Sequence, residues 1–328
     1  MEKCTIVADW IMRAPKANMI RMTILQLRRN EDIMKKNRVA IIGFGNIGRS
    51  VLEAINSSSD FELAGIVDVY KPDNLSNIEI VSDISRLTDV HVAIIAAPSK
   101  LVPDIAADLL AKGICCVDGY DIHNTIYEYK MRMQDIACKH DVVSVIAAGW
   151  DPGTDSMVRT LMLAMAPKGL TYTNFGPGIS MGHSVCARGK EGVKDALSMT
   201  MPKGEGIHRR MVYVELEDGA DIEAVTANIK MDPYFINDET QVTVVDSVSK
   251  LRDMGHGVTI NRKGASGLTY NQLFSFDMRI NNPALTGQIL VSAARAALKQ
   301  KPGAYTMIEL PLIDLIEGDL ETLIRTLV

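Results

Sequence analysis

The sequence lacks the features that mark several classes of protein. No apolar run approaches the ~20 residues that a bilayer-spanning helix needs. The net charge is −5, which gives no positive surface of the kind that binds nucleic acid or an anionic membrane. No Cys-x-x-Cys occurs, and the six histidines show no metal-ligand spacing. We therefore expect no nucleic acid, no membrane and no metal among its partners.

Cysteines are also few. Five of them, an odd number in a long chain without a secretory signal, argue for reduced thiols and a cytoplasmic protein. Hydrophobic residues make up 47% of 328 residues, enough to fill the cores of about two domains. Residues 1–33 mix basic and apolar side chains without the continuous apolar region of a signal. We expect them to be an N-terminal extension outside the fold; a targeting or regulatory arm is the alternative.

The most informative segment runs from Val39 to Asp68. The uninterrupted apolar run Val39 to Ile42 is typical of a strand buried on both faces, and a Gly-x-Gly-x-x-Gly turn follows it directly. A helical pattern and a second apolar strand come next, and that strand ends at Asp68, twenty residues after Gly48. The glycines permit a tight turn, the approach of a pyrophosphate, and close helix–strand packing, respectively. An ordinary glycine turn is the alternative to the dinucleotide site that we predict at Gly43, Gly45, Asn46, Ile47, Gly48 and Asp68.

Strand and helix patterns keep alternating up to about residue 151. This alternation predicts a doubly wound, Rossmann-type parallel sheet over residues 34–151, an α/β fold. Ligands of such sheets bind beyond the carboxyl ends of the strands. The strand pattern from Val90 to Ala97 ends in Ala97-Pro98-Ser99, where small residues suit a surface for a flat ring. We expect Ala97, Pro98 and Ser99 to contact the nucleotide.

The character changes after residue 152. Alternating strand patterns dominate and helical ones are fewer, so residues 152–282 are expected to form a second, antiparallel α+β domain. Asn282-Pro283 predicts the start of a last helix, with Asn282 as its cap and proline at the first helical position. Residues 283–328, which hold that helix and the tail, are expected to return to the nucleotide domain.

Candidate chemical groups gather at the expected ligand edge. Asp118, Asp121 and Asp151 all fall at strand ends, although Asp151 also suits a helix N-cap. Trp150 suits either a substrate wall or the core. In the second domain, His208-Arg209-Arg210 offers guanidinium groups for a carboxylate, with a solvated charge run as the alternative. Gly255-His256-Gly257 places a histidine on a tight turn, where a structural role is as common as a chemical one.

Several of these segments together resemble one enzyme family, meso-diaminopimelate dehydrogenase. The resemblance extends from about Lys36 to the C-terminus and is closest to the shorter form of the family. The glycine turn is not specific to that family, whereas three of the other segments are. The specific segments are Gly149-Trp150-Asp151-Pro152-Gly153, Ser180-Met181-Gly182-His183 and Asn281-Asn282-Pro283-Ala284-Leu285-Thr286; the resemblance also includes Asp121-Ile122-His123, Phe175-Gly176-Pro177-Gly178, His208-Arg209-Arg210 and Met254-Gly255-His256-Gly257.

The resemblance implies a cytoplasmic homodimer whose second domain binds substrate and forms the dimer. It implies reversible oxidative deamination of meso-2,6-diaminopimelate at its D-centre. The products would be L-2-amino-6-oxopimelate (tetrahydrodipicolinate on cyclisation), ammonia and reduced NAD(P). Such a reaction belongs to lysine and peptidoglycan precursor synthesis. Another amine or D-amino-acid dehydrogenase on the same scaffold, or a non-catalytic nucleotide sensor, would be the alternatives.

The resemblance also implies roles for individual residues. Asp121 and Asp151 would hold the reacting D-amino group, with Asp121 our first choice as proton acceptor and Asp151 our second. The remaining substrate contacts would be Trp150 and Phe175 as walls, the backbone of Met181 and Gly182 beside them, and Thr200, Arg210, His256 and Asn282 at the carboxylates and the distal L-centre.

The chain departs from the family pattern after the second strand. The family carries an arginine pair there, which suits the 2′-phosphate of NADP, the family's usual cofactor. This chain has Asp68-Val69, with only Lys71 nearby. An aspartate accepts hydrogen bonds from a free ribose 2′-hydroxyl and repels a phosphate. We therefore expect NAD(P)(H) as cofactor, with NAD used at least as well as NADP.

Overall fold

A computed structural model describes residues 36–69, 78–251 and 255–328. The expected extension, residues 1–33, lies outside the described residues, and so does Lys71. Among the described residues, no helix is long and apolar enough to cross a membrane.

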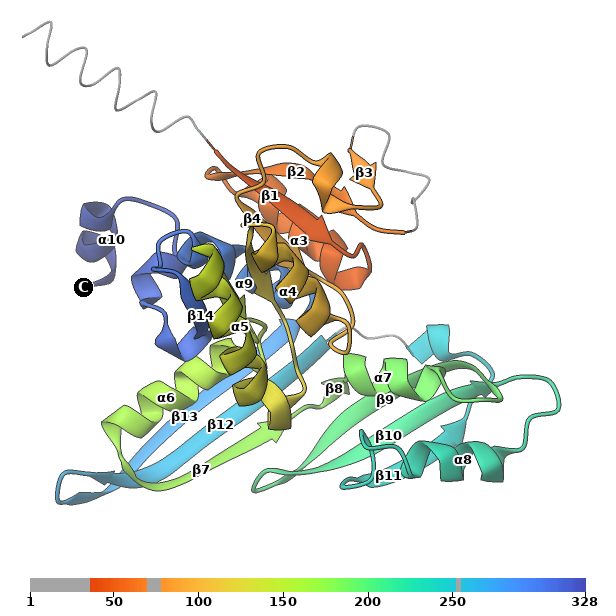
Figure 1. The fold of residues 1–328 in the computed structure, drawn as a ribbon. Helices are drawn as coiled ribbons and strands as arrows, with labels where there is room; N and C mark the ends of the chain where they lie inside the picture. Colours follow the sequence, from red (N-terminus) through yellow and green to blue (C-terminus); the bar gives the residue numbers. More distant parts are fainter. Residues whose placement is uncertain (1–35, 70–77, 252–254) are drawn as a thin grey trace, which may run out of the picture.

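The first unit of the fold is a seven-stranded parallel sheet (Figure 1). The chain starts at β1, passes outward through β2 to β3, and then crosses to β4 on the other side of β1. This change of direction creates a switch point between β1 and β4. The predicted doubly wound sheet is confirmed. In spatial order, the strands are β14 (Gly303–Thr306), β6 (Val143–Ile146), β5 (Cys115–Asp118), β4 (Val92–Ile95), β1 (Asn37–Ile42), β2 (Phe61–Val67) and β3 (Ile80–Val81).

Alternate residues of each strand enter two separate cores. Val39 and Ile41 of β1 pack on one face of the sheet, against α3 (Asn46–Ser57) and α9 (Asn282–Ala297). Ala40 and Ile42 pack on the other face, against α4 (Val102–Ala111) and α5 (Ile126–His140). Because helices cover both faces, the strand needs apolar residues at every position, which explains its uninterrupted apolar run.

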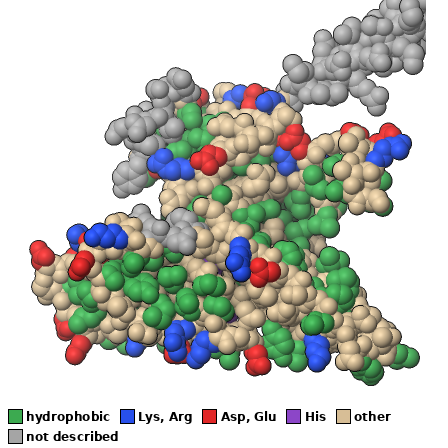
Figure 2. Space-filling view, turned by 180° about the vertical axis from the view of Figure 1, so that it is seen from behind, with side chains coloured by type: hydrophobic (Ala, Val, Ile, Leu, Met, Phe, Trp, Pro, Cys, Tyr) green, Lys and Arg blue, Asp and Glu red, His purple; other side chains and the backbone are tan. Residues whose placement is uncertain are grey.

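The second unit contains two sheets, which form the lower half of the molecule in Figure 1. Hydrophobic side chains are spread over this half in Figure 2. Helices α6 (Thr154–Met165), α7 (Met181–Arg188) and α8 (Ile222–Lys230) belong to it. One sheet holds, in spatial order, β11 (Glu239–Val244), β10 (Ile207–Leu216), β9 (Val193–Gly204) and β8 (Gly178–Ile179); the other holds β13 (Thr269–Asn281), β12 (Gly255–Ser266) and β7 (Lys168–Phe175).

The expectation of a purely antiparallel second domain is wrong at one pair of strands. β10 and β11 run parallel, because α8 lies between them and returns the chain to the end of the sheet at which β10 begins. The other neighbouring pairs in these two sheets are antiparallel. The unit is therefore an α+β arrangement with one mixed sheet.

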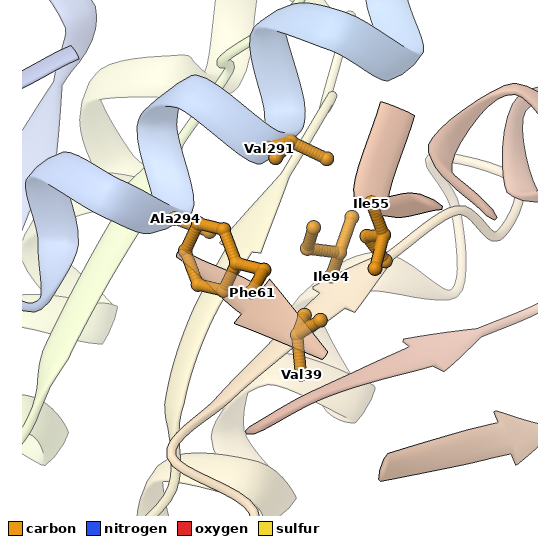
Figure 3. Close-up of a pocket in the computed structure, with 6 residues that line it drawn as sticks. All are labelled: Val39, Ile55, Phe61, Ile94, Val291 and Ala294. Atoms are coloured by element: carbon orange, nitrogen blue, oxygen red, sulfur yellow. The ribbon is translucent and has the colours of Figure 1, made fainter. Parts of the chain in front are cut away.

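The C-terminal segment lies against the first unit. Helix α9 packs along α3 so closely that a Cβ at Gly287 would lie 2.6 Å from the carbonyl carbon of Ser50. Strand β14 then adds to the sheet beside β6, and α10 (Leu320–Leu327) follows. Figure 3 shows how α9 packs on the first unit. Six apolar side chains surround a void that is too small for a water molecule: Val39, Ile55, Phe61, Ile94, Val291 and Ala294.

The predicted cap of α9 is wrong by one residue. The Asn281 side chain, not that of Asn282, accepts a hydrogen bond from the backbone of Ala284, at 3.3 Å. Asn282 is instead the first residue of the helix, and its side-chain oxygen accepts from the hydroxyl of Thr286 at 3.3 Å. The Asn282 side chain is thus turned along the helix, at the boundary between the two units.

The last two glycines of the turn after β1 give a testable contrast. A Cβ at Gly48 would lie 2.2 Å from the carbonyl oxygen of Gly43, whereas a Cβ at Gly45 would meet no atom within 4 Å. We expect Gly48→Ala to lower the free energy of unfolding by roughly 1–3 kcal/mol, the usual range for overpacking. Gly45→Ala is the matched control and should unfold like the wild type in urea. Equal stability of the two variants would contradict this account of the turn.

Candidate active site

The glycine turn lies at the switch point of the parallel sheet. Gly43 has a φ of +91°, and a Cβ there would lie 2.9 Å from the carbonyl oxygen of Ala96, at the end of β4. Gly48 brings α3 against this turn, and the space beside Gly45 stays open. The first turn of α3 has no side-chain cap, so its N–H groups are available to an anion. The turn therefore fits the pyrophosphate of a dinucleotide.

Asp68 lies beside this turn, at the end of β2. Its Oδ2 accepts a hydrogen bond from the backbone N–H of Phe44 at 2.6 Å. Val69, which follows, has 83% of its surface exposed. The carboxylate is thus held near the glycine turn, in the place where the sequence predicts the ribose contact.

Asp121 joins the cofactor edge to the second unit. The hydroxyl of Ser99, which follows β4, donates to Oδ1 of Asp121 at 2.6 Å. On the other side, a Cβ at Gly182 would lie 3.7 Å from Oδ2 of Asp121 and 3.3 Å from the ring of Tyr234. Met181 is the first residue of α7, so Asp121 faces the N-terminal turn of that helix. Three of the predicted contacts, Ser99, Asp121 and Gly182, are therefore brought together.

Asp151 lies on a tight turn between β6 and α6. The Gly149 N–H donates to the carbonyl of Pro152 at 3.0 Å, and a Cβ at Gly153 would lie 1.8 Å from the Gly149 carbonyl oxygen. The suggested N-cap role of Asp151 is wrong, because Gly153 is the N-cap of α6. The Asp151 side chain, 12% exposed, instead accepts a hydrogen bond from Nη2 of Arg159 at 2.9 Å.

A second carboxyl group adjoins Asp151. Asp155, on the first turn of α6, is fully buried, and its Oδ2 accepts from the same Arg159 nitrogen at 2.7 Å. Burial holds the pKa of Asp155 well above its usual range, and the charge of Asp151 and a hydrogen bond with its carboxyl group act in the same direction. His123 lies on the solvent side, with Nε2 4.0 Å from Oδ2 of Asp151.

Aromatic rings line the space beside this turn. The Trp150 ring lies edge-on to Phe175, with centroids 5.9 Å apart, and edge-on to His256 at 5.0 Å. Trp150 is only 7% exposed and belongs to the core between α6 and β12, so its core role is confirmed, and its role as a substrate wall stays a prediction. The backbone N–H of Phe175 donates to Nε2 of His208 at 2.7 Å, which fixes the position of that histidine.

Polar groups of the four-stranded sheet lie at the other end of the candidate site, which we call the far end because it is away from the glycine turn. Thr200 on β9 and Arg210 on β10 are register partners, and the guanidinium of Arg210 donates to the Thr200 hydroxyl. Arg210 also pairs with Asp238 at 2.5 Å, and Arg209 with Glu239 at 2.7 Å. The expected solvated charge run describes Arg209, which is 40% exposed beside an exposed Glu239, whereas Arg210 is only 14% exposed and is held by Asp238.

His256 is buried against β8. A Cβ at Gly178 would lie 2.7 Å from its Nδ1, and Nδ1 has no hydrogen-bond partner among the described residues. Burial, together with the positive charge of Arg210, lowers the pKa of His256 to about 4. The imidazole is therefore neutral at physiological pH, and its buried Nδ1 lies beside Gly178.

Asp118 takes no part in this site, although it also ends a strand. Its carboxyl group is fully buried and accepts from the Tyr129 hydroxyl at 2.7 Å and from the backbone of Tyr120 and Ala147. Burial raises the pKa of Asp118 to about 6. This carboxyl group connects β5 to α5 and to the residues after β6.

Known proteins share both units of the fold. Residues 37–144 match the oxidoreductase family with an NAD-binding Rossmann fold, and residues 149–209 match the diaminopimelic acid dehydrogenase C-terminal domain. The chain is 56% identical to the meso-diaminopimelate D-dehydrogenase of Bacteroides fragilis, over 90% of this chain and 100% of that protein. The chain belongs to the meso-diaminopimelate dehydrogenase family.

Other members of the family are similar over most of their length. The meso-diaminopimelate D-dehydrogenase of Lysinibacillus sphaericus is 33% identical, over 85% of this chain and 95% of that protein. Among solved structures, the C. glutamicum DAP dehydrogenase in complex with DAP is 29% identical with a TM-score of 0.82. An engineered D-amino acid dehydrogenase bound to NADP⁺ is 27% identical with a TM-score of 0.79. Both cover 90% of this chain and 100% of theirs.

Three residues near the candidate site were not predicted from the sequence. Asp155 follows Asp151 at helical spacing, and that spacing was the available signal. Asp238 and Tyr234 lie between α8 and β11, in a segment without a motif, and only the fold brings them to Arg210 and Gly182. Their positions depend on contacts that are distant in the sequence.

Proposed function

We propose that the protein is an NAD(P)-dependent oxidoreductase that deaminates meso-2,6-diaminopimelate reversibly at its D-centre. The products are L-2-amino-6-oxopimelate, which cyclises to tetrahydrodipicolinate, and ammonia, as in lysine and peptidoglycan precursor synthesis. One observation carries the proposal: the site has carboxylates at its cofactor edge and a cationic, hydroxyl-bearing cluster at its other end. Two such ends suit a substrate with an amino and a carboxylate group at each terminus. The family of the chain supports the same reaction.

At the near end, Asp121 is proposed to accept a proton from the substrate ammonium, and Asp151 to hold the same nitrogen. The Ser99 hydroxyl fixes Oδ1 of Asp121, which leaves Oδ2 directed toward Gly182. Asp151 already has an arginine partner, since Nη2 of Arg159 lies 2.9 Å from its Oδ1. That partner suits binding of an ammonium group more than uptake of its proton, so Asp121 remains the first choice and Asp151 the second.

The rest of the chemistry needs positioning and exclusion of water. A bound nicotinamide would supply the acceptor for the hydride from the D-centre carbon. The loss of that hydride and of one proton from the ammonium group leaves an iminium group, which water converts to the carbonyl product as ammonium departs. Trp150 and Phe175 are proposed to shield this reacting end, and the backbone of Met181 and Gly182 to bind the nearby carboxylate.

At the far end, four side chains are proposed to bind the distal carboxylate and the L-centre. Arg210 is held toward Thr200 by its pairing with Asp238, so its guanidinium is positioned before substrate arrives. His256 offers a neutral nitrogen that has no partner among the described residues. Asn282 would approach from the start of α9.

We also propose a homodimer, as the family resemblance implies, in the cytoplasm. Apolar side chains stand exposed on α6 and on the three-stranded sheet, which is the surface that we assign to the second copy. The exposed set is Leu161, Leu163 and Met165 on α6, Leu170 on β7, and Leu268, Tyr270 and Leu273 at the β12–β13 hairpin.

The function is tested by absorbance at 340 nm with purified protein. We expect meso-diaminopimelate to give reduced cofactor and the L,L isomer to give little or none, because only a D-centre presents its hydrogen to the nicotinamide while both ends are bound. A D-amino acid with a short apolar side chain and no distal carboxylate serves as the control for the far end. No absorbance rise with either NAD or NADP would reject the enzyme, and equal rates with both isomers would reject the stereochemical assignment.

Asp121→Asn tests the proton acceptor. The amide keeps the size of the side chain and can still contact Ser99, but it cannot take a proton. We expect kcat to fall by about 10²-fold or more, the usual scale for a positioned acid–base group, with cofactor binding unchanged. If kcat stays at the wild-type value while cofactor binds normally, Asp121 is not the acceptor and the role passes to Asp151.

Cofactor choice is tested at Asp68. Next to a 2′-phosphate its carboxylate would add a repulsion on the order of a kcal/mol or more at an effective dielectric near 20, so NAD should be used at least as well as NADP. Asp68→Arg with Val69→Arg should move the preference toward NADP. Val69→Arg alone, at an exposed position that retains Asp68, is the matched control. A wild-type kcat/KM for NADP tenfold or more above that for NAD would contradict the prediction.

A further inference from the structure

We propose that Asp155 is a positioning residue for the proposed reaction, a neutral carboxylic acid that donates a hydrogen bond to the Asp151 carboxylate. This inference rests on the proposed function, since Asp151 is one of the two acids assigned to the reacting amino group. Asp155 itself has no exposed surface and so does not contact substrate.

The geometry leaves Asp155 one oxygen for this role. Its Oδ2 accepts from Nη2 of Arg159 at 2.7 Å, and the same nitrogen donates to Oδ1 of Asp151 at 2.9 Å. The second oxygen, Oδ1 of Asp155, is buried and receives no hydrogen bond from any described residue. A buried acceptor without a donor is costly, whereas a protonated oxygen at this position becomes a donor toward its neighbour.

The surrounding charges favour the neutral acid. Arg159 is the cation that both carboxyl groups share, and β7 contributes only the Thr173 hydroxyl, 3.4 Å from Nε of Arg159. Of the two histidines that face Asp151, His123 is largely exposed, and burial keeps His256 neutral by lowering its pKa to about 4. Two ionised carboxylates would exceed the charge of one guanidinium, and one retained proton removes the excess.

A neutral Asp155 has a defined effect on the site. Asp151 then receives hydrogen bonds from Arg159 and from Asp155, which fix its carboxylate while its single negative charge remains available to the substrate ammonium. An ionised Asp155 would repel Asp151 and compete for the same arginine. The general principle is known from other enzymes, in which two neighbouring carboxyl groups take different protonation states because their surroundings differ.

The test compares Asp155→Asn with Asp155→Ala. Asparagine is neutral, has nearly the same shape and carries an N–H donor, so we expect kcat/KM for meso-diaminopimelate within about threefold of the wild type. Alanine removes the donor that holds the Asp151 carboxylate, so kcat/KM should fall at least tenfold. Thr160→Ala, at an exposed position further along α6, is the matched control and should keep the wild-type kcat/KM. Circular dichroism and cofactor binding check that each variant folds.

Difference infrared spectroscopy gives a second readout that needs no turnover. The wild type at pH 7 should show the carbonyl band of a protonated carboxylic acid that is missing from Asp155→Asn. Absence of this band, or an equal loss of kcat/KM in the asparagine and alanine variants, overturns the proposal, and so does an alanine variant with the wild-type kcat/KM. A wild type that shows the band but does not oxidise meso-diaminopimelate refutes the proposed function and leaves Asp155 a neutral acid.

Discussion

The active-site edge depends on the contact between Gly149 and Gly153. The chain leaves β6, reverses within five residues and enters α6, and the backbones at the two ends of this reversal touch. A Cβ at Gly153 would lie 1.8 Å from the Gly149 carbonyl oxygen, so no other residue type fits without displacing the helix. Because the turn is this tight, α6 begins directly at the ligand edge. Asp151 on the turn and Asp155 inside the helix can then share one arginine.

The two acids assigned to the amino group have different surroundings. Asp121 contacts a neutral hydroxyl and lies between the two units, next to the start of α7. Asp151 contacts a guanidinium and has a buried acid beside it. The two identical side chains therefore have neighbours of different charge, a neutral hydroxyl at Asp121 and a guanidinium at Asp151. Their division of labour would follow from position alone.

Sequence patterns predicted the parts of the fold whose contacts join residues that are close together in the chain. The apolar run of β1, the glycine turn and the acid at the end of β2 each have a mechanical cause within thirty residues, and the structure brings them together as expected. Strand β14 was not predicted, because four residues at the edge of a sheet carry too little pattern. The parallel pairing of β10 with β11, and the approach of Asp238 to Arg210, are set by the return of the chain after α8. Such contacts have no signal in a short stretch of sequence.

Helix α9 connects the two units of the fold. It begins with Asn282, where the chain leaves the second unit, and its Gly287 contacts α3, the helix that starts at the glycine turn. Within the described residues, the chain passes between the units near Gly149–Gly153 and again at Asn281–Asn282. Because Asn282 and Gly287 belong to one helix, any substitution that shifts α9 against α3 also displaces Asn282.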